Sequence, residues 1–267
     1  MNRPWPLRIA PAGLRVSLYY RFYRARAARR PGLYAAASLA AAPGVRMRLE
    51  PGDEIHDCIA YTGLYEAALT QCFMRHARQG GLLVDVGANY GYFSLLWAAA
   101  ASGNRVVAFE PSPRNVAGLR RNVENNGFGE RIRVDARAAS RACGKMAFDF
   151  GPAEQTGWGG AVRENKSGAA GVPAVRLDEA LAGERCIDVL KIDVEGAEPW
   201  VLEGATALLC ERRVKQIFFE VNEPRLAALG LASAASETLL RAAGYEVAPL
   251  GDTRGEVREF SAVLRAT

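Results

Sequence analysis

The stretch that decides the fold is Leu82–Ser94, which runs Leu-Leu-Val-Asp-Val-Gly-Ala-Asn-Tyr-Gly-Tyr-Phe-Ser. Five mostly apolar residues lead into a turn with two glycines, and a helix-compatible stretch follows. Glycine permits a tight turn and lets a ligand approach the backbone, which a side chain would block. We therefore predict a buried strand that ends in a ligand-binding turn and continues into a helix.

From Leu82 onward, short apolar stretches alternate with stretches that have helical spacing. The predicted strands are Leu82–Val86, Arg105–Glu110, Ile132–Ala136, Asp188–Asp193 and Gln216–Val221. The predicted helices are Tyr92–Ala101, Pro113–Asn126, Leu177–Leu181 and Ala197–Leu209. Buried strands joined by crossover helices indicate an α/β fold with a doubly wound parallel sheet. Residues 151–172 are rich in Gly and polar residues, which predicts a long loop over the sheet.

Two acidic residues at strand ends indicate what the turn binds. The glycine spacing is G-x-x-x-G rather than G-x-G-x-x-G, and Asp85 at the turn entrance would oppose a phosphate but suit an ammonium group. Glu110 ends the second strand, where a carboxylate can accept both hydroxyl hydrogens of a ribose. An ammonium group and a ribose together describe S-adenosylmethionine. The candidate cofactor-binding residues are Asp85, Gly87, Asn89, Gly91, Phe93, Glu110, Pro111 and Asp135, the last placed to meet the adenine.

A second pair of acids, Asp193 and Glu195, follows the fourth strand. In an extended segment, residues two apart face the same side, so both carboxylates would converge on the pocket. We predict that they are catalytic, as a base or as groups that orient the methyl acceptor. Holding a divalent ion and capping the next helix are the alternatives. No Cys-x-x-Cys pair is present, and we expect no bound metal.

Three further residues are candidates for binding the acceptor. Glu220 and Asn222 end the fifth apolar strand and would reach the same sheet edge. Tyr61, like Tyr65, would either close over the cofactor or pack an N-terminal helix onto the sheet. His56 is predicted to lie at the surface.

The sequence resembles the FkbM family of S-adenosylmethionine-dependent methyltransferases. The resemblance rests on Asp85–Gly91, Phe109–Pro111, Arg176–Asp178 and Asp188–Glu198, and it extends from about residue 57 to residue 245. It implies a class I methyltransferase (Rossmann-like) fold, with a mostly parallel seven-stranded sheet and helices on both faces. It also implies methylation of a hydroxyl oxygen on a small molecule, sugar or glycan.

The composition fits one large globular domain or one domain with an extension, since 49% of the 267 residues are hydrophobic and 24% are charged. The formal charge of +5 is unevenly placed. Residues 1–50 contain ten Arg and one acid, Glu50, and so carry +9, which leaves −4 for the remaining residues. We predict a basic, partly helical extension at 1–50 and the methyltransferase domain at 51–267.

Within the extension, Leu14, Leu18 and Phe22 recur at helical spacing among arginines between Leu14 and Arg30. Such a basic amphipathic helix can lie on an anionic membrane surface, dock on an acidic partner, or pack on its own domain.

Other functions share parts of the pattern. A nicotinamide-dependent oxidoreductase is disfavoured by the glycine spacing and by Asp85. A nucleic-acid methyltransferase is disfavoured because neither Asn-Pro-Pro nor Asp-Pro-Pro follows the fourth strand, and a non-catalytic binding module remains open. No apolar run approaches the roughly 18–20 residues of a membrane span, so we expect a soluble, cytoplasmic protein.

Overall fold

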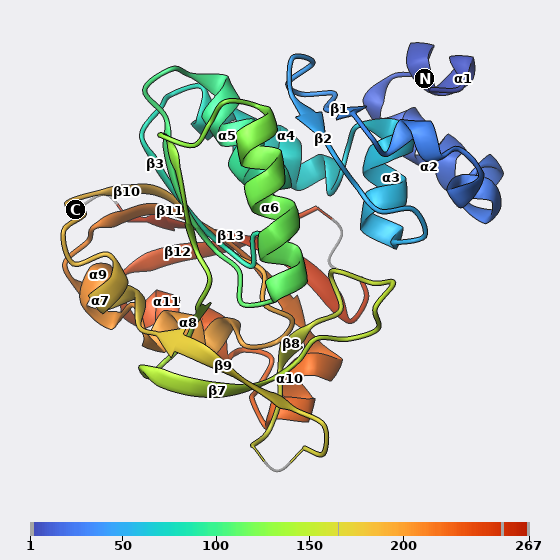
Figure 1. Ribbon diagram of the computed structural model, residues 1–267. Coiled ribbons are helices and arrows are strands. Elements are labelled where there is room, and N and C mark those ends of the chain that lie inside the picture. Colours follow the sequence, from blue (N-terminus) through green and yellow to red (C-terminus); the bar gives the residue numbers. More distant parts are fainter. Residues whose placement is uncertain (1–2, 165, 252–253, 266–267) are drawn as a thin grey trace.

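A computed structural model describes residues 3–164, 166–251 and 254–265. Its centre is a seven-stranded sheet with the order β12-β13-β11-β10-β3-β4-β5 (Figure 1). The strands are β3 (Leu82–Val86), β4 (Arg105–Phe109), β5 (Ile132–Asp135), β10 (Ile187–Ile192), β11 (Val214–Asn222), β12 (Tyr245–Leu250) and β13 (Val257–Leu264). The predicted seven-stranded α/β sheet is therefore confirmed.

The sheet is mostly parallel. Strands β5, β4, β3, β10 and β11 pair in parallel, whereas β13 runs antiparallel to both β11 and β12. Counted along the chain, these seven strands have the spatial order 3-2-1-4-5-7-6. Val86 pairs with Ile192 on one side and with Phe109 on the other, so β3, β4 and β10 end at one edge.

Alternating strand residues supply two separate cores, one on each face of the sheet. Leu83 and Val106 pack against α4 (Ala67–Ala77), α5 (Tyr92–Ala100) and α6 (Pro113–Asn125). Val84 and Leu190 pack on the opposite face, against α7 (Leu177–Ala180), α8 (Glu198–Glu203), α9 (Thr206–Cys210) and α11 (Ala235–Ala242). Period-two side-chain alternation in a sheet covered on both faces produces this division.

The N-terminal residues form α1 (Trp5–Ile9), α2 (Ala12–Phe22), two 3-10 turns (Arg24–Arg29 and Pro31–Leu33), the hairpin β1 (Ala37–Ser38) and β2 (Arg46–Met47), and then α3 (Glu54–Thr62). Leu7, Tyr19 and Met47 are buried in the same core as Phe73 of α4. The packing is therefore continuous across the predicted boundary at residue 50. In Figure 1 this segment, coloured blue, lies at one end of the molecule.

The prediction of a structureless loop at 151–172 is wrong in part. A second sheet, of order β6-β9-β7-β8, consists of β6 (Ala138–Ala139), β7 (Gly144–Asp149), β8 (Gly160–Ala161) and β9 (Ala170–Val175). Both β8 and β9 pair with β7, a strand the sequence pattern did not indicate, and β9 also pairs with β6. Helix 197–209 is also divided, into α8 and α9, near Gly204, where an added Cβ would lie 2.1 Å from the Ser140 carbonyl oxygen. The remaining helix, α10, spans Glu223–Leu229.

Within the part of the chain that the structure describes, none of the helices has both the length and the apolar character needed to cross a membrane.

Candidate functional site

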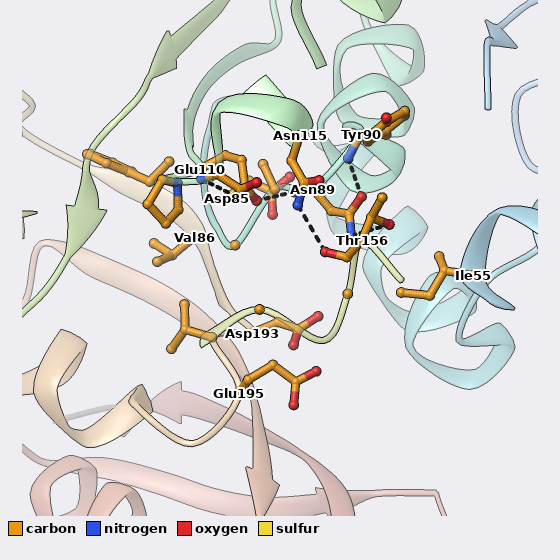
Figure 2. Close-up of a pocket in the computed structure, with 18 of the residues that line it drawn as sticks. Ile55, Asp85, Val86, Asn89, Tyr90, Glu110, Asn115, Thr156, Asp193 and Glu195 are labelled. Atoms are coloured by element: carbon orange, nitrogen blue, oxygen red, sulfur yellow. Dashed lines mark hydrogen bonds between the residues drawn. The ribbon is translucent and has the colours of Figure 1, made fainter. Parts of the chain in front are cut away.

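A cavity of about 1110 Å³, counting the space open to solvent, lies at the edge where the parallel strands end. Nine of the predicted site residues line it: Asp85, Gly87, Asn89, Phe93, Glu110, Pro111, Asp193, Glu195 and Glu220. Figure 2 shows Asp85 and Glu110 on one side of the space, with Asp193 and Glu195 across from them. The topology thus brings together acids that lie far apart in the sequence.

The turn after β3 is held against two neighbouring strand ends. Gly87 has φ 81°, and an added Cβ would lie 1.8 Å from the Asp193 carbonyl oxygen. On the other side, the backbone N–H groups of Asn89 and Ser112 each donate to the Glu110 carboxylate at 2.9 Å. Burial raises the pKa of Glu110 to about 7, although these two hydrogen bonds oppose the shift. The carboxylate therefore both shapes the turn and faces the cavity.

Asp85 is a buried carboxylate with one unused oxygen. It is 1% exposed, and Ser94 Oγ donates to its Oδ2 at 2.6 Å. Its Oδ1 has no hydrogen-bond partner among the described residues. Burial raises the pKa of Asp85, while Lys191 and Ser94 act in the opposite direction. An unsatisfied buried acceptor is costly unless a ligand pairs with it.

Lys191 holds Asp193 in place. Its Nζ donates to Asp193 Oδ2 at 3.0 Å and lies 4.8 Å from the centre of the Phe93 ring. Burial opposes the charge of Lys191, but the carboxylates of Asp193, Asp85 and Glu66 outweigh it and raise its pKa. Lys191 therefore stays cationic in the wall of the cavity and fixes one oxygen of Asp193.

Glu195 lies in a turn rather than in the extended segment that we predicted. Its backbone has φ 56°, in the left-handed region that non-glycine residues adopt at a cost. Asn222 Nδ2 donates to its Oε2 at 3.2 Å, and Arg225 Nε lies 3.5 Å from the same oxygen. Burial and then the charge of Asp193 raise the pKa of Glu195 to about 7, and Arg225 opposes this shift.

The start of helix α8 is stabilised by a different acid. The backbone N–H groups of Val194 and Gly196 donate to Glu198 Oε1, at 3.1 and 3.2 Å. The capping alternative therefore does not account for Asp193 or Glu195. Both of these carboxylates face the cavity instead (Figure 2).

Four of the predicted site residues lie outside the cavity lining. Tyr61 is a correction, because it packs against Tyr19 and Tyr23 and donates its hydroxyl to the Ala27 carbonyl at 3.0 Å. Its role is the alternative one, attachment of the N-terminal segment. Tyr65, by contrast, does line the cavity.

The other three residues outside the lining, Asp135, Gly91 and Asn222, contact neighbouring residues of the protein instead. The Asp135 carboxylate accepts from Arg137 Nε at 2.8 Å and does not reach the cavity lining. An added Cβ at Gly91 would lie 2.5 Å from Leu119 Cδ1, so this glycine serves the packing of α5 on α6. Asn222 caps α10 with its side-chain oxygen and holds Glu195 with its amide.

The sequence reasoning missed a group of residues that close one wall of the cavity. His56, predicted at the surface, is 1% exposed, and its ring centre lies 4.3 Å from that of Tyr90, with the two rings tilted by 54°. Asp53, the N-cap of α3, accepts at Oδ2 from the Thr156 hydroxyl at 2.7 Å. Asn89 Nδ2 also donates to that hydroxyl, at 3.2 Å. Through these two hydrogen bonds Thr156 holds the end of the 152–157 loop over the turn (Figure 2). In the sequence, the Asp53-x-x-His56 start of α3 was the signal available for this arrangement.

Among the described residues, no group of three or more His, Cys, Asp or Glu side chains is arranged to hold a metal ion.

The model of the Methyltransferase FkbM domain family matches residues 85–247, from the acid of the glycine turn to β12. The chain belongs to this family. Residues 85–247 therefore form a class I methyltransferase domain whose cofactor is S-adenosylmethionine, and the oxidoreductase alternative is not favoured.

Three curated relatives extend the comparison. The 31-O-demethyl-FK506 methyltransferase FkbM of Streptomyces tacrolimicus is 31% identical over 60% of this chain and 74% of its own length. The 2-O-methyltransferase NoeI of Sinorhizobium fredii is 28% identical over 54% of this chain and 65% of its own. The AMB antimetabolite synthetase AmbE of Pseudomonas aeruginosa is 31% identical over 62% of this chain, which spans only 10% of AmbE. Among solved structures, the SAH-bound Podospora anserina methyltransferase PaMTH1 aligns over 76% of this chain and 80% of its own, with 12% identity and a TM-score of 0.47. This similarity is too distant to add to the family assignment.

The cavity fits S-adenosylmethionine in two respects, and Gly87 shapes it by letting the turn approach the end of β10. Asp85 offers a buried, unpartnered oxygen that suits the ammonium group. Glu110 presents a carboxylate to a ribose while its backbone hydrogen bonds keep it fixed.

Proposed function

We propose that the protein methylates a hydroxyl oxygen of a small-molecule, sugar or glycan acceptor, with Glu195 as the general base and Asp193 as the orienting group. The observation that carries this proposal is the pair of carboxylates in the same cavity as Asp85 and Glu110. The printed names of two relatives, an FK506 methyltransferase and a 2-O-methyltransferase, support an oxygen acceptor.

When bound, S-adenosylmethionine supplies a methyl group on a cationic sulfur, and its transfer to a hydroxyl leaves a neutral thioether and releases one proton. Glu195 accepts this proton. With a pKa of about 7, its carboxylate is ionised in about half of the molecules at neutral pH, and it is more basic than that of an ordinary glutamate. Asp193, tied at Oδ2 to Lys191, presents Oδ1 to a neighbouring hydroxyl of the acceptor. Fixed partners of this kind hold the reacting oxygen in line with the methyl group.

The side of the cavity at Asp193 and Glu220, where we place the acceptor, favours a neutral polyol over an anion. A smaller adjoining pocket shares Lys191, Asp193 and Glu220 with the cavity and adds Glu66 and Glu259. Burial and then the charge of Asp193 raise the pKa of both Glu66 and Glu220. Groups that are partly protonated can donate as well as accept hydrogen bonds, which suits hydroxyl recognition. A phosphate or carboxylate on the acceptor would instead be repelled by the charge of Asp193.

The pH dependence of turnover tests the assignment of the base. We expect kcat to rise with pH through about 7, because Glu195 is active only when it has lost its proton. In Asp193→Asn this rise should move to lower pH, because the charge of Asp193 is one cause of the raised pKa. Methyl transfer measured from pH 5 to 9 provides both profiles. A rise at the same pH in wild type and Asp193→Asn would remove Glu195 as the titrating base.

Cofactor affinity tests the other side of the cavity. Asp85→Asn and Glu110→Ala should each weaken S-adenosylhomocysteine binding about ten-fold or more, since a hydrogen bond to a charged group contributes about 1.5–3 kcal/mol. Isothermal titration calorimetry measures the change, and Glu246→Gln, on an exposed position of β12, is the matched control. Wild-type affinity in both site variants would contradict the placement of the cofactor.

A further inference from the structure

The N-terminal helices expose an unusual set of large apolar side chains. Eight such side chains are exposed among the described residues, and five of them lie in the first 22 residues. Four of these five, which we call the N-terminal patch, are Trp5 (69% exposed), Ile9 (72%), Leu14 (53%) and Phe22 (62%), whereas Tyr20 (45%) lies on another side of α2 from Leu14 and Phe22. Clustered exposed apolar residues mark an interaction surface, whereas single ones do not.

Helix α2 is apolar on two sides. Tyr19 is 1% exposed and packs against Tyr61 of α3, so this side attaches the helix to the domain. Leu14, Leu18 and Phe22 follow one another at i, i+4 and i+8, along a different side, and Leu14 and Phe22 are exposed. A helix that only packs on its own domain carries polar residues on its outer side. Leu18 is partly buried against the core, so internal packing accounts for Leu18 but leaves the exposure of Leu14 and Phe22 unexplained.

The charge around the N-terminal patch is mainly positive. Residues 1–49 contain no Asp or Glu. Arg8 and Arg30 are exposed, and among the described residues their guanidinium groups make no hydrogen bond or ion pair. Arg21 lies over the Phe22 ring at 5.6 Å, so its charge stays beside the patch. Arg24, by contrast, is paired with Glu54.

We propose that the N-terminal patch docks on an anionic membrane surface. Aromatic and aliphatic side chains flanked by arginines suit the boundary between lipid headgroups and acyl chains, where apolar burial and attraction to anionic lipid act together. A second copy of the chain fits less well, because a two-fold contact through this patch would oppose two surfaces of the same positive charge. The patch is also separate from the cavity, since α3 lies between α2 and the cavity wall at Ile55.

Vesicle sedimentation of the full chain tests this proposal. We expect binding to phosphatidylcholine vesicles that contain 30% phosphatidylglycerol, and binding at least ten-fold weaker to pure phosphatidylcholine or in 1 M salt. Ile9→Ser/Phe22→Ser and Arg8→Glu should each lower the partition coefficient at least several-fold. The matched controls are Val263→Ser, an exposed valine of β13, and Arg78→Glu, an exposed arginine after α4, which should both bind as wild type does.

Two further measurements make the result decisive. The thermal unfolding temperature of each variant should match wild type, because the replaced side chains are exposed. Absence of binding to anionic vesicles, or equal loss in the control variants, would overturn the proposal. Concentration-dependent self-association lost in Ile9→Ser/Phe22→Ser, without vesicle binding, would assign the patch to a second copy. Vesicle binding that persists in both patch variants would place the membrane contact elsewhere.

Discussion

Replacing Glu195 by glutamine is expected to lower kcat by about 100- to 10,000-fold, the range typical of a positioned general base. The amide keeps the size of the side chain and its hydrogen bond with Asn222 but cannot accept the hydroxyl proton. S-adenosylhomocysteine affinity should change little, because Glu195 lies across the cavity from Asp85 and Glu110 (Figure 2). Single-turnover methyl transfer and calorimetry on the same preparation separate the two effects.

The control for this experiment is a distant carboxylate. Glu246→Gln, at an exposed position of β12, should retain full turnover. Full turnover in Glu195→Gln would remove Glu195 from the base role and leave Asp193 as the candidate. Loss of cofactor affinity in parallel with turnover would instead show that Glu195 supports the cavity.

Replacing Gly87 by alanine should produce the largest structural effect. The left-handed backbone at φ 81° costs an alanine about 1–2 kcal/mol. In addition, the new Cβ would lie 1.8 Å from the Asp193 carbonyl oxygen, so the turn and the end of β10 must move apart. We expect a lower thermal unfolding temperature and S-adenosylhomocysteine affinity reduced at least about ten-fold, because one shift displaces both sides of the cavity.

Gly127→Ala separates strain from steric overlap. Gly127 also has a left-handed backbone, at φ 67°, but an added Cβ there meets nothing within 4 Å. This variant should lose stability by about 1–2 kcal/mol, or roughly 2–8 °C in Tm, and bind the cofactor normally. Equal effects of Gly87→Ala and Gly127→Ala on affinity would show that the contact with Asp193 is unimportant.

Local sequence predicted the strand ends well because the signal is short-range. Apolar runs that end in Asp85, Glu110 and Asp193 mark buried strands, and parallel strands place their carboxyl ends at one edge of the sheet. The cavity could therefore be located before its shape was known. The apolar pattern could not predict the turn at Glu195 after β10, because this turn depends on contacts with Asn222 of β11 and Arg225 of α10.

The sequence failed where a side chain acts through distant partners. His56 has the composition of a surface helix start, yet Tyr90 and the 152–157 loop bury it. Asp135 is a different case, because it lies at a strand end like Glu110 but pairs with Arg137, only two residues away. Neither outcome has a periodic signal, since strand and helix spacing do not show which side chains pair.

By itself, the sequence determined five strands of the sheet, the family and the four acids Asp85, Glu110, Asp193 and Glu195, because strand periodicity and glycine turns are local properties of the chain. Only the tertiary structure decided that Tyr61 serves packing, that Thr156 closes the cavity wall, and that Leu14 and Phe22 face outward. An amphipathic pattern states that two helix sides differ, whereas the neighbouring elements decide which side is covered.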